Sequence, residues 1–288
     1  MQTKLTNEEH HRMSAISASG LKLIDRSPLH YWAAYVDPNR EPRDPTAAMK
    51  LGTATHCAIL EPAEFDARYT VLPEGLDRRT KEGKALYAEI EATGKTALSA
   101  PDWKRIGAMA TAGRSHSFAA MLFDDGPEFE TSLFWADPVS GVHCKARPDM
   151  MILPCADWPN GLIVDVKTTT DASPEGFGKS AWSYAMHLQA ALYTEGFGIL
   201  FNTAEPPPFM WLAVESDAPH AVAMYTASPA IIEYGRGECA RLRDIYARCV
   251  ACNDWPGYMR APSELILPGY AMRVIETNET EVESISYV

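Results

Sequence analysis

An apolar, β-branched run at residues 162–166 follows the turn signal of residues 159–161, as expected for a buried strand. Side chains alternate along a strand, so Asp165 and Lys167 are predicted to share one face. The valines on either side of Asp165 then share the opposite face. The pattern therefore places a carboxylate and an ammonium group side by side at one end of a hydrophobic strand.

A second strand is predicted at residues 142–147, after a hairpin turn at residues 137–141, and it leads to Asp149. A hairpin-like return of the chain brings Asp149 opposite Asp165. Two carboxylates and a lysine that converge suit the metal-assisted hydrolysis of phosphodiesters, because carboxylate oxygens hold a hard divalent cation. Asp-x-Lys on a strand also occurs as an ordinary ion pair across one face, so both interpretations stand at this point.

The remaining pattern alternates between helical and strand-like segments. Helices are predicted to open at residues 16–21 and 27–28, to span residues 47–60, to run through residues 86–90, 103–123 and 184–193, and to end with residues 228–251. Further strands are predicted at residues 128–135, 209–215 and 221–225. This order predicts one α/β domain over residues 1–272, with a flexible polar segment at 1–15 and an acidic tail at 273–288.

Composition narrows the class of protein. The 288 residues are 46% hydrophobic and 22% charged, as in soluble globular proteins. No apolar run has the length of a membrane span, and the first residues lack the apolar region of a signal peptide, so a cytoplasmic protein without membrane contact is expected. The six cysteines are then reduced thiols. A net charge of −12 argues against indiscriminate coating of nucleic acid, but it allows a basic channel within an acidic surface.

Three further positions carry candidate chemistry. His56 lies among small residues in the predicted helix 47–60 and is either an ordinary packed histidine or a metal ligand. Glu130 is either a supporting carboxylate or an exposed strand residue. Gln189 and Tyr193 are four residues apart and share a helix face, from which they either bridge to the backbone or orient the lysine and the scissile strand.

The densest basic cluster lies at residues 78–84. It forms either a solvated helix face or a contact with a DNA backbone or a 5′-terminal phosphate. On the second interpretation, the candidate DNA-binding residues are Arg78, Arg79, Lys81, Lys84, Tyr184 and Tyr193.

Pro148-Asp149 together with Asp165-Val166-Lys167 resembles the signature of the PD-(D/E)xK nuclease superfamily. The order His56, Glu130, Asp149, Asp165-x-Lys167 and Gln189-x3-Tyr193 resembles its RecB-type branch. The segments at residues 16–19, 27–28, 52–62, 79–84, 147–149 and 255–258 are similar to those of the RecE (exonuclease VIII) nuclease domain, across roughly residues 14–272. Met186 departs from this pattern, which has an aromatic residue there.

This resemblance implies a restriction-endonuclease-like fold, with a central mixed sheet flanked by helices and an N-terminal helical elaboration. It implies an exonuclease that degrades the 5′-ended strand of linear double-stranded DNA and leaves 3′ overhangs. Such proteins form ring-like homo-oligomers and work beside a RecT-like single-strand annealing protein in phage-type recombination. By position, His56, Asp149, Asp165 and the Val166 carbonyl hold Mg²⁺, with Mn²⁺ as a substitute. Lys167 positions or activates the attacking water, and the remaining site residues, Glu130 and Gln189, support the site.

Three different functions also remain open from the sequence. Cys57, Cys239, Cys249 and Cys252 faintly resemble the one early and three late cysteines of iron–sulfur nucleases in the same superfamily. Cys249 and Cys252 also have the ordinary spacing of a half-buried helix, which is favoured. The second function is that of a structure-specific endonuclease, and the third is that of a non-catalytic subunit that binds DNA ends.

Overall fold

The computed structural model describes residues 1–41, 44–73, 75–76, 79–269 and 273. The acidic tail predicted at 273–288 therefore lies almost entirely outside the described residues. Within the described part, no helix is both long enough and apolar enough to cross a membrane.

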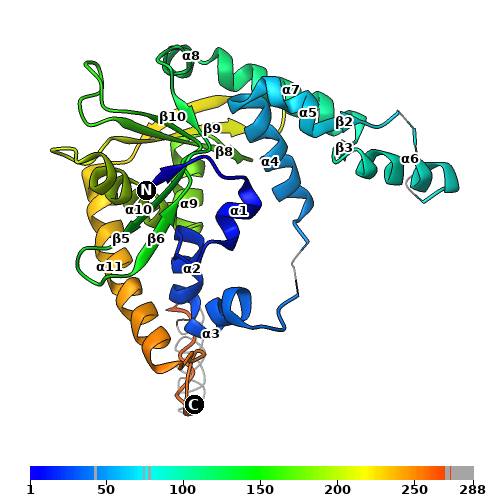
Figure 1. The fold of residues 1–288 in the computed structure, drawn as a ribbon. Helices are drawn as coiled ribbons and strands as arrows, with labels where there is room; N and C mark the ends of the chain where they lie inside the picture. The colour runs from blue at the N-terminus through cyan, green and yellow to red at the C-terminus, as the bar shows by residue number, and fades with distance from the viewer. Residues whose placement is uncertain (42–43, 74, 77–78, 270–272, 274–288) are drawn as a thin grey trace, which may run out of the picture.

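A five-stranded mixed sheet forms the centre of the fold (Figure 1). Its order is β10 (Val222–Thr226), β9 (Phe209–Glu215), β8 (Leu162–Thr169), β7 (Met150–Ile152) and β4 (Glu128–Phe129). The pair β8–β9 is parallel, whereas the other neighbours are antiparallel. A second sheet has the order β1 (Gln2–Thr3), β5 (Ser132–Ala136) and β6 (His143–Ala146), and β2 (Tyr69–Val71) pairs with β3 (Thr96–Leu98) alone.

Several helices begin where the sequence supplies a cap. The hydroxyl groups of Ser17, Thr46 and Ser228 accept hydrogen bonds from the first turns of α2, α4 and α11. The helices are α1 (Asn7–Arg12), α2 (Ala18–Arg26), α3 (Pro28–Tyr31), the π-helical turn η1 (Trp32–Val36), α4 (Ala47–Leu60), α5 (Pro62–Arg68), α6 (Lys81–Ala92), α7 (Ala100–Ser115), α8 (Ser117–Asp124), α9 (Pro174–Ser183), α10 (Met186–Phe201) and α11 (Pro229–Cys252).

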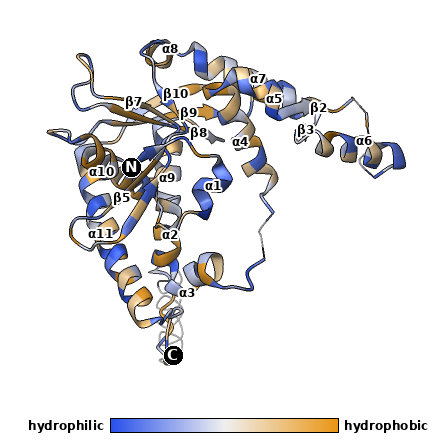
Figure 2. Ribbon diagram, in the orientation of Figure 1, coloured by the Kyte–Doolittle hydropathy of each residue, from blue (hydrophilic) through white to orange (hydrophobic). Residues whose placement is uncertain are grey.

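The central sheet separates two hydrophobic cores. Val164 and Val166 of β8 pack with Ile59 of α4 and with residues of α7 and α8. Ile163 points to the other face, where it packs with Phe197 of α10 and with residues of α2, α9 and α11. Figure 2 shows the apolar strands enclosed between these helices. The expected mixed sheet flanked by helices, and the alternation along β8, are both confirmed.

The chain passes between the two sheets at two places that the pattern does not reveal. Residues 128–135 are predicted as one strand, but the structure breaks it into β4 and β5, which belong to different sheets. Asp149 is predicted at the end of a strand, but Pro148 separates β6 from β7, and Asp149 precedes β7. Proline cannot donate a ladder hydrogen bond, which suits a position between sheets.

The N-terminal segment also differs from the sequence interpretation. Residues 1–15 are predicted to be flexible, but β1 pairs with β5, and α1 has a complete capping box at Thr6. The ammonium group of the buried Lys145 donates to the carbonyl oxygens of His10 and Met13, at 2.8 and 2.9 Å. A buried ammonium group needs such acceptors. The hydrogen bonds from Lys145 therefore hold the polar segment 1–15 against the second sheet.

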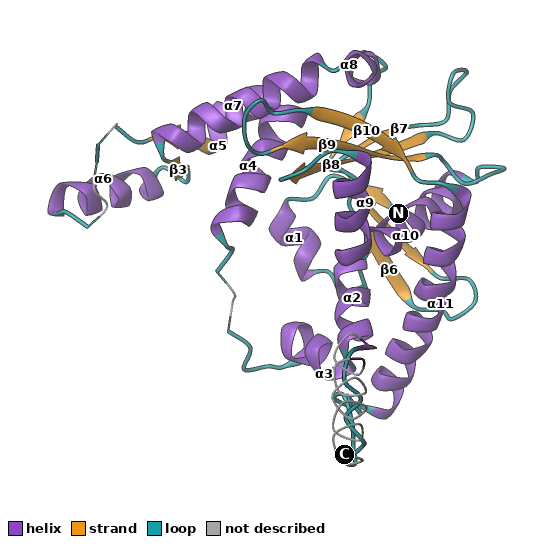
Figure 3. Cartoon of the chain, turned by 180° about the vertical axis from the view of Figure 1, so that it is seen from behind, coloured by secondary structure: helices purple, strands orange, loops and turns teal. Residues whose placement is uncertain are grey.

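Four elements form an extension from the body of the molecule. α5, β2, β3 and α6 lie beyond the ends of α4 and α7, and α6 is farthest from the central sheet in both views (Figures 1 and 3). The short parallel sheet of β2 and β3 joins the two ends of the segment that carries α6. Residues 79–84 of the predicted basic cluster therefore lie on the extension rather than beside β8.

Candidate active site

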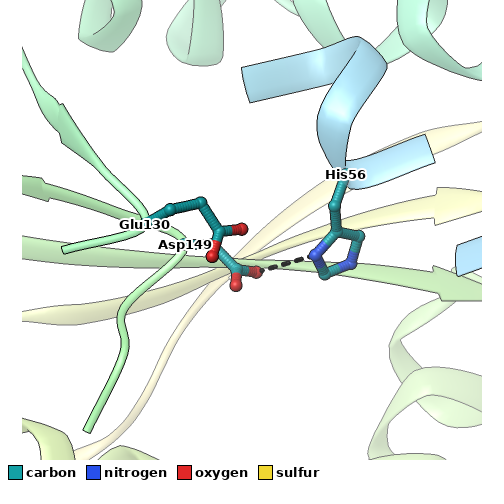
Figure 4. Close-up of side chains that lie close together, drawn as sticks. All are labelled: His56, Glu130 and Asp149. Carbon is teal, nitrogen blue, oxygen red and sulfur yellow. Dashed lines mark ion pairs between the residues drawn. The ribbon is translucent and has the colours of Figure 1, made fainter. Parts of the chain in front are cut away.

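Glu130 and Asp149 lie where the chain crosses from one sheet to the other. Glu130 adopts the left-handed backbone conformation, with φ of 49°, which is uncommon for a residue with a side chain. Its N–H donates to the carbonyl oxygen of Asp149 at 3.1 Å. The two crossings are thus bound to each other, and both carboxylates point toward the same place (Figure 4).

His56 approaches these carboxylates from α4. Its Nδ1 lies 3.4 Å from Oδ2 of Asp149. Gly52 lies one turn earlier, where an added Cβ would make an ordinary contact of 3.6 Å with Oγ1 of Thr168, so α4 lies beside the end of β8. One ligand atom from each of His56, Glu130 and Asp149 lies within 4.8 Å of the others. Among the described residues, these three form the one such group of histidine, cysteine or acidic side chains, and none of the six free cysteines joins it.

Asp165 and Lys167 stand beside this group on β8. Oδ2 of Asp165 forms an ion pair with the ammonium group of Lys167. The other oxygen, Oδ1, accepts a hydrogen bond of 2.7 Å from the side-chain amide of Gln189. Asp165 is 1% exposed, so its orientation is fixed on both sides. The N–H of Val166 donates to Oδ2 of Asp149 at 2.7 Å, which links β8 to the crossing before β7.

The charges in the site perturb one another. Burial by itself raises the pKa of Asp149, but the imidazole of His56 and the ammonium of Lys167 outweigh burial and lower it. Burial raises the pKa of Asp165, and the Asp149 charge adds to this, despite the opposing Lys167. Burial also raises the pKa of Glu130, with the Asp149 charge acting in the same direction. Crowded carboxylates in a buried site favour a bound cation, which relieves their repulsion.

The donor set fits a divalent metal ion. Two carboxylates and one imidazole supply the oxygen and nitrogen ligands that Mn²⁺ accepts, and the carboxylates suit Mg²⁺. Oδ2 of Asp165 is buried and accepts no hydrogen bond from the described residues, although it is paired in charge with Lys167. Glu130, expected as a supporting residue, lies in the group with ligand spacing. Asp165, expected as a ligand, adjoins that group without belonging to it, and the expected ligand role of the Val166 carbonyl stays a prediction.

Arg147 and Tyr193 lie next to the carboxylates of the site. Nε of Arg147 donates to Glu130 at 2.7 Å, and Nη1 donates to the carbonyl oxygen of Leu5 at 2.7 Å, so the N-terminal segment braces the carboxylate. Tyr193 is only 9% exposed. Burial, together with the charges of Asp165 and Asp149, raises its pKa. Tyr193, expected at the DNA, is largely buried but lines the cleft that opens at Lys167, so its contact with DNA stays a prediction.

A cleft of about 680 Å³ opens at Lys167 and Gln189. Hydroxyl groups from α2, from the end of β8 and from α9 line it, as does Lys22 of α2. Burial and the charge of Lys167 lower the pKa of Lys22 to about 8, despite the opposing charge of Asp165. Within the described residues, no carboxylate forms an ion pair with Lys22. The cleft therefore presents an uncompensated cation beside the candidate site.

The other predicted DNA-binding residues are spread apart. Arg79, Lys81 and Lys84 are exposed at the start of α6 on the extension, whereas Arg78 lies outside the described residues. Tyr184 is exposed and lines the cleft. Met186, where an aromatic residue was expected, is buried in the core as the first residue of α10.

Arg147 and Lys22 have no role predicted from the sequence. The signal for Arg147 is its place directly before Pro148-Asp149, where any side chain lies beside the crossing. The signal for Lys22 is its spacing from Ser19, because residues three apart share a helix face. Neither signal identifies a partner without the fold.

Comparisons with known proteins agree with this architecture. A crystal structure from Eubacterium rectale, described as a "putative exonuclease", is similar with a TM-score of 0.61 at 14% sequence identity, and the match covers 94% of this chain and 98% of that one. This likeness shows the fold. A crystal structure of SSO0001 matches with a TM-score of 0.34 at 13% identity, over 82% of this chain and 81% of that one. No curated protein matches.

A family model matches residues 17–262, which is most of the chain. Its description is PDDEXK-like domain of unknown function (DUF3799). The matched range includes both Pro148-Asp149 and the Asp-x-Lys of β8. The protein belongs to the DUF3799 family of PDDEXK-like domains.

Proposed function

We propose that this protein is a metal-dependent nuclease that degrades linear double-stranded DNA from its ends. The observation that carries the proposal is the group of His56, Glu130 and Asp149, with ligand atoms within 4.8 Å, beside the ion pair of Asp165 and Lys167. Asp165 and Lys167 alone would be explained as an ordinary ion pair on a strand. An ion pair does not explain three converging ligand side chains beside a lysine and an open cleft.

The geometry supports a role for each side chain. His56, Glu130 and Asp149 would hold the divalent cation, with Asp165 as a further ligand at the edge of the group. A divalent cation would supply polarisation of a phosphoryl oxygen and a lower pKa of water. Lys167 would donate to the attacking water or to the phosphate, where it would stabilise developing negative charge. Gln189 fixes the Asp165 carboxylate through its amide.

The polarity and the biological setting belong to the same proposal. The resemblance to RecE supports digestion of the 5′-ended strand, which leaves 3′ overhangs for recombination by strand annealing. It also supports a ring-forming homo-oligomer with a RecT-like annealing partner in the cytoplasm. The description of the similar Eubacterium rectale structure is in keeping with exonuclease action.

A duplex labelled at one 5′ end tests the proposal. In Mg²⁺, the protein is expected to release labelled nucleotide from linear DNA, to leave covalently closed circular DNA intact, and to stop when EDTA removes the metal. Cleavage of the closed circle would favour a structure-specific endonuclease instead. Duplex binding without any nucleotide release in Mg²⁺ or Mn²⁺ would favour a non-catalytic subunit that binds DNA ends.

A further inference from the structure

Three aromatic side chains gather on the surface where α9, α10 and α11 meet. The ring of Trp182 stacks on that of His187, with centroids 5.5 Å apart and an interplanar angle of 28°. Tyr234 lies 5.9 Å from Trp182 and 5.1 Å from His187 between ring centroids. Trp182 is 66% exposed and Tyr234 is 49% exposed. We call Trp182, His187 and Tyr234 the aromatic cluster.

The cluster is held in place by the fold. Gly235 follows Tyr234, and a Cβ at residue 235 would collide with the carbonyl oxygen of His187. α11 therefore lies against the start of α10, which brings Tyr234 to His187. Ala185, between α9 and α10, has the left-handed conformation with φ of 47°, and this sharp corner places Trp182 beside His187. A solvent-exposed tryptophan fixed in this way is available for a ligand with a flat face.

The aromatic cluster lies near the active-site cleft, although its three residues are not among those that line it. Tyr184 lies two residues after Trp182, is 68% exposed and lines the cleft. Burial and the charge of Lys22 lower the pKa of His187, and the charge of Lys167 lowers the pKa of Lys22. Lys22 therefore lies near both the aromatic cluster and Lys167, and it lines the cleft together with Tyr184.

The charges around Lys22 and the aromatic cluster suit an anionic chain. Asp25 and Glu238, the acidic groups that act on His187, both pair with Arg241 at 2.7 and 2.6 Å. Lys22 has no such partner among the described residues. In a protein of net charge −12, a free cation beside exposed aromatic rings selects a ligand that has both phosphates and bases.

We propose that the aromatic cluster and Tyr184 bind the unpaired bases of a single-stranded DNA segment next to the cleaved end, while Lys22 binds its phosphate backbone. This proposal rests on the proposed nuclease function and names the form of DNA that the site holds. Bases stack on aromatic side chains without sequence preference, and a cation beside them binds the backbone. An exonuclease that removes one strand produces such an unpaired segment at every step.

Equilibrium binding without metal tests the stacking role, with two fluorescent duplexes as probes. One carries a short single-stranded thymidine tail, and the other carries a tail of the same length made of abasic sites. The wild-type chain is expected to prefer the thymidine tail. Trp182→Ala is expected to weaken binding of the thymidine tail by about 5- to 150-fold and to leave binding of the abasic tail unchanged.

Tyr258→Ala is the matched control. Tyr258 is 68% exposed, and its contacts are with Arg26 and His30, away from the cleft. This variant is expected to bind both tails as the wild type does. Sedimentation of Trp182→Ala gives the oligomeric state, which is expected to be unchanged.

Three results would overturn the proposal. Unchanged binding of both tails by Trp182→Ala would refute base stacking on Trp182. If the Trp182→Ala oligomer also dissociates, the aromatic cluster is a protein interface. Equal weakening of both tails would exclude base stacking. A wild-type protein that digests DNA but shows no preference for bases in the tail would refute the aromatic site and leave the nuclease standing. A preference for the thymidine tail without digestion in Mg²⁺ would support the aromatic site and refute the nuclease function.

Discussion

Replacing Lys167 with glutamine is expected to lower the rate of phosphodiester cleavage by roughly 10²- to 10³-fold, because a positioned donor to developing negative charge contributes about that much. Glutamine keeps an N–H donor toward Asp165, with which Lys167 forms its ion pair. The measurement is the single-turnover rate on an end-labelled linear duplex at saturating Mg²⁺.

Lys179→Gln is the control for this variant. Lys179 is an exposed lysine of α9 whose ion-pair partner is Glu175 on the same helix, so its loss is expected to leave the rate unchanged. Cooperative unfolding of Lys167→Gln would show that the variant is folded, so the lower cleavage rate does not come from a loss of structure. A folded Lys167→Gln protein that cleaves at the wild-type rate would remove the lysine from the mechanism.

Replacing Arg243 with leucine is expected to lower the free energy of unfolding by about 3–5 kcal/mol, because it leaves buried carboxylates without their cation. Arg243 of α11 is 5% exposed. Its Nη1 donates to Glu195 of α10 at 2.6 Å, and its Nη2 lies 3.3 Å from Asp137, which follows β5. The arginine thus joins two helices and the second sheet behind the active site.

Urea unfolding measures this loss, with Arg241→Leu as the control. Arg241 lies two residues earlier on the same helix, but its pairs with Asp25 and Glu238 are exposed to solvent. Exposed pairs contribute about 0–1 kcal/mol, so Arg241→Leu is expected to change the free energy of unfolding by no more than that. Similar losses in the two variants would contradict the structural role given to Arg243.

Local sequence signals predict the parts of the site that lie within one element. Asp165 and Lys167 share a face because strand side chains alternate, and the structure shows both on the face opposite Val164 and Val166. The helix predicted at 47–60 has those bounds, since a capping threonine precedes it and Glu61-Pro62 ends it. The helix predicted at 228–251 differs from α11 by one residue at each end.

The parts that the sequence does not predict depend on partners far along the chain. The left-handed conformation of Glu130 has no marker such as glycine, and its N–H bond to Asp149 joins residues from two crossings. The N-terminal segment is polar by itself, and only the buried Lys145 explains why it packs. The basic cluster at 78–84 is recognisable as basic, but the place of its described residues 79–84 on an extension depends on how β2 pairs with β3.

The residues of the metal site show the same difference between local and distant signals. His56 is one histidine in an apolar helix until the fold brings Asp149 to 3.4 Å from its ring. Glu130 could not be separated from an exposed strand residue, because its neighbour Arg147 is seventeen residues away in sequence. The chemistry of single residues is therefore readable from the chain, whereas the ligand group requires the two sheet crossings to meet.

Binding of Mn²⁺, followed by electron paramagnetic resonance, tests the metal centre most directly. The wild-type protein is expected to bind Mn²⁺ saturably, and Asp149→Asn is expected to weaken that binding by more than about tenfold, since the amide keeps the bond from Val166 but loses the charge. Glu128 is a carboxylate of β4 that lies outside the ligand group. The control variant Glu128→Gln is therefore expected to bind Mn²⁺ as the wild type does. If Asp149→Asn binds Mn²⁺ as tightly as the wild type, His56, Glu130 and Asp149 do not form the metal site.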